Sequence, residues 1–134
     1  MKVDGACHCG RIVFEAEVDP ERVRVCHCAD CQSLTGSAFR VTAPTEESNF
    51  RLLAGAPKTY LKTTAESGAP RLQAFCGDCG SPLYATSPAG ENRTFGLRVG
   101  TLKQRERLIP KVQIWARSKL SWLPPLPGEP FERD

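Results

Sequence analysis

Seven cysteines are the residues of this 134-residue chain best suited to chemistry, and they fall in three short groups. The groups are Cys7-His8-Cys9, Cys26-His27-Cys28-Ala29-Asp30-Cys31 and Cys76-Gly77-Asp78-Cys79. Thiolates at such spacing favour zinc, which binds sulfur tetrahedrally, whereas magnesium and calcium prefer oxygen ligands. An iron–sulfur cluster is the main competing occupant. The spacing therefore predicts metal binding.

The local backbone supports this prediction in each group. Residues i and i+2 of an extended segment point to the same face, so each Cys-x-Cys pair can present two thiolates to one ion. His8 and His27 then point away; they stay alternative ligands, although the thiolates already supply the coordination. The last group has the spacing of a metal knuckle, and Gly80 after it tolerates unusual backbone angles.

The seven thiols divide most economically into two sites, because three of them lie within six residues of sequence. The local site would be Cys26, Cys28 and Cys31, and the other four would close a structural site: Cys7, Cys9, Cys76 and Cys79. Three ligands leave a coordination position open, as catalytic zinc sites do. We predict one structural zinc and a second, catalytic zinc, while an empty second site stays open as an alternative.

The segments that must hold these cysteines look like short strands. Residues 11–18 alternate, with Ile12, Phe14, Ala16 and Val18 on one face. Only residues 29–34 are expected to form a short helical turn, because no segment keeps a 3.6-residue period for three turns. Gly- and Pro-containing turns separate further expected strands at 23–25, 39–42, 50–53, 59–64, 72–75, 83–85, 94–99 and 112–116. The predicted fold class is mainly β.

Length and composition set the remaining limits. The length predicts one domain over residues 1–134, and the prolines after Leu123 predict an extended tail. A net charge of +3 from scattered basic residues predicts no nucleic-acid or membrane partner. The start of the chain lacks the apolar stretch of a signal peptide, so we expect a cytoplasmic location, where disulfides are disfavoured.

Together the motifs resemble the glutathione-dependent formaldehyde-activating enzyme family, which is also grouped with centromere protein V. The resemblance covers most of the chain and rests on Gly5-Ala6-Cys7-His8-Cys9-Gly10, on residues 26–31 with Thr35-Gly36, and on Phe75-Cys76-Gly77-Asp78-Cys79-Gly80. It implies an Mss4-like zinc-binding fold of small antiparallel β-sheets. It also implies the ligand division given above, with the catalytic zinc held by Cys26, Cys28 and Cys31.

By the same resemblance, the reaction is the addition of glutathione to formaldehyde, giving S-hydroxymethylglutathione, and is classed as a carbon–sulfur lyase reaction in reverse. A zinc-bound thiol is held as thiolate near neutral pH, so the open position could aim a glutathione sulfur at a carbonyl carbon. Three thiolates leave the site net negative, which favours thiolate delivery over carbonyl polarisation. The expected partners are glutathione or a similar thiol and a small electrophile such as formaldehyde.

Glutathione also carries carboxylates, which need cationic or backbone donors. For each candidate a solvated surface charge is the simpler interpretation, because lysine and arginine are mostly exposed. The candidates are Arg40, Lys62, Arg98, Arg117 and Lys119.

One position departs from the family pattern. Family members often have a histidine before the C-terminal tryptophan, where Val112-Gln113-Ile114-Trp115 offers Gln113. Because an amide does not titrate, any proton-transfer role of that histidine would be lost here. Trp115 and Trp122 could roof a pocket, although core packing is the simpler expectation.

Two functions of other classes compete with the enzyme. A non-catalytic zinc module would bind a protein partner, as Mss4-like folds also do, with the three-cysteine site closed or empty. A redox- or metal-responsive protein would oxidise Cys26, Cys28 and Cys31 or exchange their metal. The fourth ligand of the three-cysteine site discriminates between these functions and the enzyme.

Overall fold

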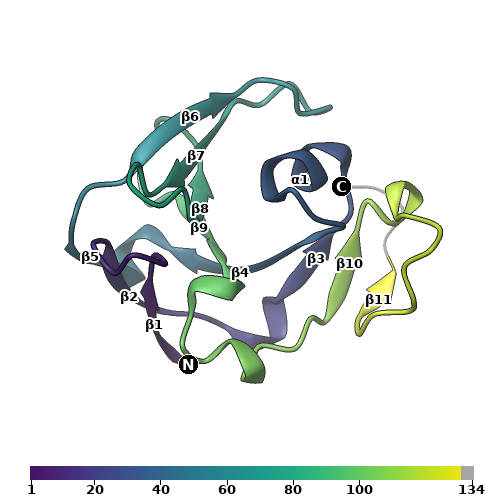
Figure 1. Ribbon diagram of the computed structural model, residues 1–134, viewed down its shortest axis with the longest axis horizontal. Helices are drawn as coiled ribbons and strands as arrows, with labels where there is room; N and C mark the ends of the chain where they lie inside the picture. The colour runs from purple at the N-terminus through teal and green to yellow at the C-terminus, as the bar shows by residue number, and fades with distance from the viewer. Residues whose placement is uncertain (131–134) are drawn as a thin grey trace.

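Strands dominate the structure, a computed structural model that describes residues 1–130 (Figure 1). A three-stranded sheet has the order β1-β2-β5, and an eight-stranded sheet has the order β11-β10-β3-β4-β9-β8-β7-β6. The small sheet comprises β1 (Lys2–Ala6), β2 (Val13–Glu17) and β5 (Phe50–Ala54). The large sheet comprises β3 (Arg24–Cys26), β4 (Arg40–Glu46), β6 (Lys58–Lys62), β7 (Arg71–Phe75), β8 (Pro82–Thr86), β9 (Thr94–Arg98), β10 (Val112–Ile114) and β11 (Glu129–Pro130). The prediction of a mainly β fold is confirmed.

Helical structure is limited to short pieces. The α-helix α1 (Ala29–Thr35) confirms the helical turn expected at 29–34 and lies between the two ends of the large sheet in Figure 1. Single 3-10 turns occur at Pro20–Arg22, Glu47–Asn49, Val99–Thr101, Arg105–Arg107 and Ala116–Ser118. In the described part of the chain, no helix has the length and apolarity that crossing a membrane requires.

The core forms where the two sheets face each other. Phe14 on β2 and Leu97 on β9 are almost fully buried there. Phe50 joins the sheets, because its ring centroid lies 5.4 Å from that of Phe14 and 4.9 Å from that of Phe95. Such aromatic contacts bury large areas and fix the relative placement of the sheets.

Strand β1 is the longer of the two strands that the sequence pattern did not predict; the other is the two-residue β11. The sequence of β1, KVDGA, contains residues that strands disfavour. It forms because it pairs antiparallel with β2, which places Gly5 opposite Phe14 and buries Val3 completely. Pairing with an already amphipathic neighbour outweighs the weak intrinsic preference of the segment.

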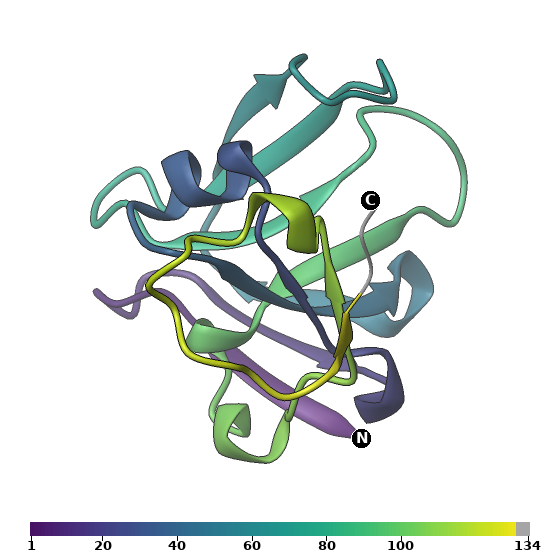
Figure 2. The ribbon, with the colours of Figure 1, turned by 90° about the vertical axis from the view of Figure 1, so that its right-hand side faces the viewer.

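Strand β10 departs from the antiparallel arrangement. It runs parallel to both β3 and β11, whereas the other strand pairs of the described residues are antiparallel. The pairing sets Gln113 opposite Val25 and Ile114 opposite Cys26. In Figure 2 the segment after β10 loops across the β3 side of the molecule. Residues 131–134 of the predicted tail lie outside the described residues.

Gly5→Ala should destabilise the protein, because a Cβ at this position would overlap the ring of Phe14. We expect a loss of about 1–3 kcal/mol in the free energy of unfolding, as for other overpacked cores. Urea denaturation measures this loss. The control is Gly100→Ala, where a Cβ would meet no atom within 4 Å. Equal stability of the two variants would contradict the described packing of β1 on β2.

Candidate functional site

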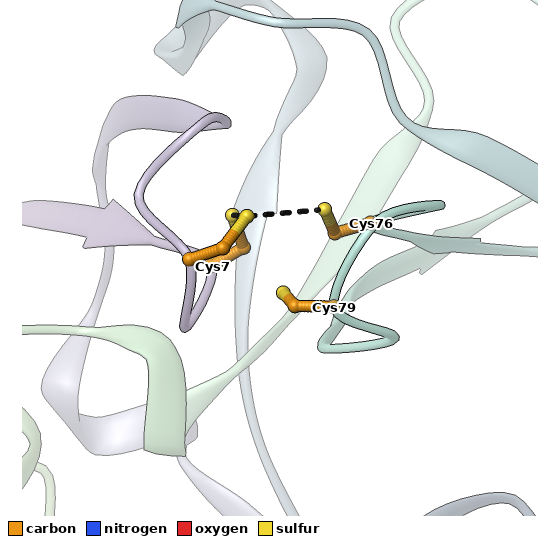
Figure 3. A group of neighbouring side chains, drawn as sticks. Cys7, Cys76 and Cys79 are labelled. Atoms are coloured by element: carbon orange, nitrogen blue, oxygen red, sulfur yellow. Dashed lines mark hydrogen bonds between the residues drawn. The ribbon is translucent and has the colours of Figure 1, made fainter.

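The four cysteines predicted to form a structural site meet between two turns (Figure 3). Cys7 and Cys9 follow β1, and Cys76 and Cys79 lie in the turn between β7 and β8. Their sulfur atoms all lie within 4.8 Å of one another. The Sγ of Cys9 lies 3.6 Å from that of Cys7 and 3.8 Å from that of Cys76. A tetrahedral zinc with Zn–S bonds of about 2.3 Å needs sulfurs roughly 3.8 Å apart, so this donor set fits zinc.

Both turns are built to present sulfur. The backbone N–H of Ile12 donates to the Sγ of Cys7 at 3.3 Å, and the Oγ of Ser81 lies 3.3 Å from the Sγ of Cys79. The hydrogen bond with the Ser81 hydroxyl, followed by backbone donors, lowers the pKa of Cys79 to about 5. Gly10 and Gly80 follow the two pairs with φ of 81° and 79°, which confirms the need for glycine after the knuckle.

Cys26, Cys28 and Cys31 also meet, with their sulfur atoms within 4.8 Å of one another. Cys26 ends β3, and Cys28 caps α1 by accepting a hydrogen bond from the backbone N–H of Cys31 at 3.3 Å. Hydrogen bonds from the thiols of Cys26 and then Cys31 hold the pKa of Cys28 far below its usual range, while the pKa of Cys26 is raised. Three converging thiols of this kind can hold a borderline-soft metal with one position left for another ligand.

The geometry of α1 follows from its sequence. Its first turn starts at the cap of Cys28, and Gly36 ends it in the left-handed conformation with φ of 65°. Gln32 then fixes the helix against its surroundings, because its Nε2 donates to the carbonyl oxygens of His27 at 2.8 Å and Ser118 at 3.1 Å. Sequence reasoning did not single out Gln32, whose type and position carry no distinguishing signal.

His27 points away from the sulfurs, as predicted, and is fully buried. Its Nε2 lies 2.8 Å from the Oε1 of Gln113. The Nε2 of Gln113 donates to the carbonyl oxygens of Leu126 at 3.1 Å and Gly128 at 3.2 Å, so the amide oxygen faces the imidazole. The Nε2 of His27 therefore donates its hydrogen to this oxygen. Gln113 is thus a buried connector of β10, the cysteine segment and residues 126–128, which the sequence did not reveal.

A pocket of about 310 Å³ opens beside the three-cysteine group. Cys28, the start of α1, residues 64–67, Trp115 and Ser118 line it, together with Lys62. Trp115 has a left-handed backbone with φ of 55°, an uncommon conformation for a bulky residue that often marks functional sites. Nothing in the sequence pattern pointed to residues 64–67. Of the three cysteines, Cys28 lines this pocket.

The five predicted cationic residues separate into distinct settings. Lys62 lines the Cys28 pocket, and its Nζ lies 3.2 Å from Asp30. Arg117 stacks 4.4 Å over the ring of Trp115 and pairs with Glu66 at 2.9 Å. Lys119 is half-buried and forms no ion pair within the described residues.

Arg40 and Arg98 do not match the expected surface charges. Arg40 is only 6% exposed, and Arg98 is partly buried, and both line a second pocket under α1. The core packing expected for Trp122 is also wrong, because 69% of this residue is exposed. Arg40 and Arg98 are buried by cross-strand neighbours that are remote in sequence, whereas Trp122 lies in a turn outside the strands.

Gln113→Leu should lower the free energy of unfolding by about 1–3 kcal/mol, because it removes the acceptor for His27 and the donor for the carbonyls of residues 126 and 128. Urea denaturation of the metal-loaded protein measures the change. Gln104→Leu, at a less buried amide, is the comparison and should cost less. A variant at Gln113 as stable as the parent would show that this amide does not hold the segments together.

Comparison with known proteins agrees with the fold and the cysteine groups. The model of the glutathione-dependent formaldehyde-activating enzyme family matches residues 2–118. An uncharacterised lyase of Schizosaccharomyces pombe is 27% identical over 92 residues, which cover 69% of this chain and 63% of that protein. A crystal structure of a Rhodobacter sphaeroides protein superposes with a TM-score of 0.57 and 25% identity, covering 77% of this chain and 88% of the other.

The family match spans both cysteine groups and extends through β10. It therefore covers the elements that position the thiols and the pocket beside Cys28. The chain belongs to the glutathione-dependent formaldehyde-activating enzyme family.

Proposed function

We propose that the chain is a zinc-dependent carbon–sulfur lyase-type enzyme that adds the thiol of glutathione, or of a similar small thiol, to formaldehyde or another small electrophile. The observation that carries this proposal is the contrast between the two cysteine groups. Four thiols converge at one site, which is enough to saturate a tetrahedral ion, whereas three thiols converge at the other, where Cys28 lines an open pocket. The family match and the lyase name of the yeast relative support the same class of reaction.

Cys26, Cys28 and Cys31 would hold the catalytic zinc, which when bound keeps a substrate thiol deprotonated near neutral pH. The residues around the pocket then orient that thiol. Lys62 lies beside Cys28 and favours a negatively charged sulfur there, and Trp115 also lines the pocket. In the addition, the sulfur forms a bond to the carbonyl carbon and the π electrons of the carbonyl move to its oxygen. That oxygen takes a proton from solvent, which balances the proton that the thiol releases to solvent when it becomes a thiolate.

Cys7, Cys9, Cys76 and Cys79 would hold the structural zinc and so clamp β1 to the β7–β8 turn. Zinc binding by such a site is worth about 10–16 kcal/mol, which is as large as the whole stability of a typical domain. Cys7→Ser should therefore leave the chain largely unfolded at 25 °C. Circular dichroism and native mass spectrometry measure the folding and the zinc content.

The matched variant is Cys31→Ser, which we expect to stay folded and to retain one zinc ion per chain, while the parent retains two. Zinc-loaded parent protein should bind glutathione, and this variant should not. Two zinc ions in Cys31→Ser would contradict the three-cysteine assignment. If the parent retains one zinc ion and binds no thiol, a non-catalytic module is favoured. If mild oxidant releases zinc from the parent and forms a disulfide among these cysteines, a redox-responsive protein is favoured.

Catalysis is tested by exchange spectroscopy between free formaldehyde and its glutathione adduct. Stoichiometric protein should accelerate the exchange at least about tenfold over the unaided reaction, consistent with the rate gain from holding reactants in position. Lys62→Met should raise the glutathione concentration needed for half-maximal acceleration. Lys103→Met, at an exposed lysine outside the pocket, should behave as the parent. Parent protein without acceleration would rule out formaldehyde as the substrate.

A further inference from the structure

We propose that the pocket under α1, between the helix and the β7–β8 end of the large sheet, is a binding site for the carboxylate of a small acid with an apolar body. The pocket has a volume of about 370 Å³, which is within the range of small-molecule sites. Its charged and amide side chains are those of Arg40, Arg98 and Gln73. The site is distinct from the Cys28 pocket, and its binding of an acid does not depend on the proposed thiol chemistry.

Strand register gathers arginine side chains on one face of the large sheet. Arg24, Thr42 and Arg98 are directly opposite one another across β3, β4 and β9. Arg40 lies two residues from Thr42 and opposite Cys26, so it shares this face. Gly96 has no side chain, so Thr42 and Arg98 can pack closely over it. A Cβ there would lie only 2.9 Å from the Cγ2 of Thr42 and 3.7 Å from the Nη1 of Arg98. The face therefore accommodates several cations close together.

Among the described residues, none of these cations has a carboxylate partner. Within residues 1–130, no ion pair involves Arg24, Arg40, Arg71 or Arg98. Instead, the Nη1 of Arg40 and the Nη2 of Arg98 both donate to the single Oε1 of Gln73, at 3.3 and 2.9 Å. The Nε of Arg40 is buried and has no hydrogen-bond partner in the described part of the chain. Buried charges of one sign without partners are costly, so a bound anion would stabilise this arrangement.

The neighbouring thiolates do not balance this charge. Arg40 lies directly opposite Cys26 across β3 and β4, so the three-cysteine group and the arginines are neighbours. A divalent ion with three thiolates has a net charge of −1, however, which offsets one arginine. Burial and the charge of Arg40 lower the pKa of Arg98 to about 9, which still leaves its guanidinium charged at neutral pH. Positive charge thus remains for a ligand.

The walls of the pocket define the rest of the ligand. Leu34, Phe75, Pro82 and the ring of Tyr60 line it, so the part of the ligand away from the arginines should be apolar. Guanidinium groups bind carboxylates through paired hydrogen bonds, and two of them converge here on one acceptor. The geometry fits a carboxylate on an aliphatic or aromatic stem better than a compact, strongly hydrated anion such as phosphate.

The test is calorimetric titration of the zinc-loaded protein with 4-phenylbutyrate, using 4-phenylbutyramide as the neutral control. We expect binding of the acid at least tenfold tighter than that of the amide, and tighter than that of inorganic phosphate. Equal binding of acid and amide, or preferential binding of phosphate, would overturn the proposal. If glutathione competes with phenylbutyrate, the proposed thiol substrate is one natural source of the carboxylate. If glutathione does not compete, the natural ligand is a separate acid. Either result presupposes that phenylbutyrate binds in this pocket.

The decisive variant is Gln73→Glu, which supplies a resident carboxylate at nearly the same position as the amide oxygen. It should raise the melting temperature and weaken phenylbutyrate binding at least tenfold, because the introduced carboxylate then balances the charge of Arg40 and Arg98. Thr59→Glu, at an exposed position of β6, adds the same charge and should leave binding unchanged. Unchanged binding in Gln73→Glu would contradict the proposed pairing with Arg40 and Arg98, whatever the outcome for thiol addition.

Discussion

The convergence of thiol sulfurs that are far apart in sequence is the constraint on which the structure depends. Cys9 and Cys76 are separated by 67 residues, yet their sulfurs lie 3.8 Å apart. That approach requires β1 to pair with β2, the small sheet to pack on the large one, and the β7–β8 turn to reach the end of β1. Four thiolates held this close repel one another unless a cation lies among them, which is why the donor set itself argues for a metal.

The second cysteine group places the same chemistry in a different setting. Its three thiols come from β3, the cap of α1 and the first turn of α1, all within one local segment. No fourth thiol reaches them from the described residues, and Cys28 borders a pocket instead. Local ligands would make the group less important for folding, and an ion held by three thiols would keep one coordination position for a substrate. In the proposed function, the four-cysteine group therefore stabilises the fold and the three-cysteine group carries the chemistry.

The sequence predicted the fold class, the helix at 29–34 and the family, because these depend on local patterning and on cysteine spacing. It did not predict β1, whose KVDGA sequence forms a strand only through pairing with β2. It treated Arg40 and Arg98 as surface charges, because their burial follows from registers among β3, β4 and β9 that no local pattern encodes. It assigned Gln113 by family position alone, whereas contacts with His27 and with residues 126 and 128 determine its role. The roles of the seven cysteines as metal ligands stay a prediction.

The central claim is that the three-cysteine metal keeps a position that a substrate thiol occupies. Zinc X-ray absorption of the protein loaded with two ions, before and after glutathione is added, tests this claim most directly. Averaged over both ions, the sulfur coordination number should rise from about 3.5 to about 4, because one site already has four thiolates and the other gains its fourth. An average that stays at its starting value in saturating glutathione would contradict the account.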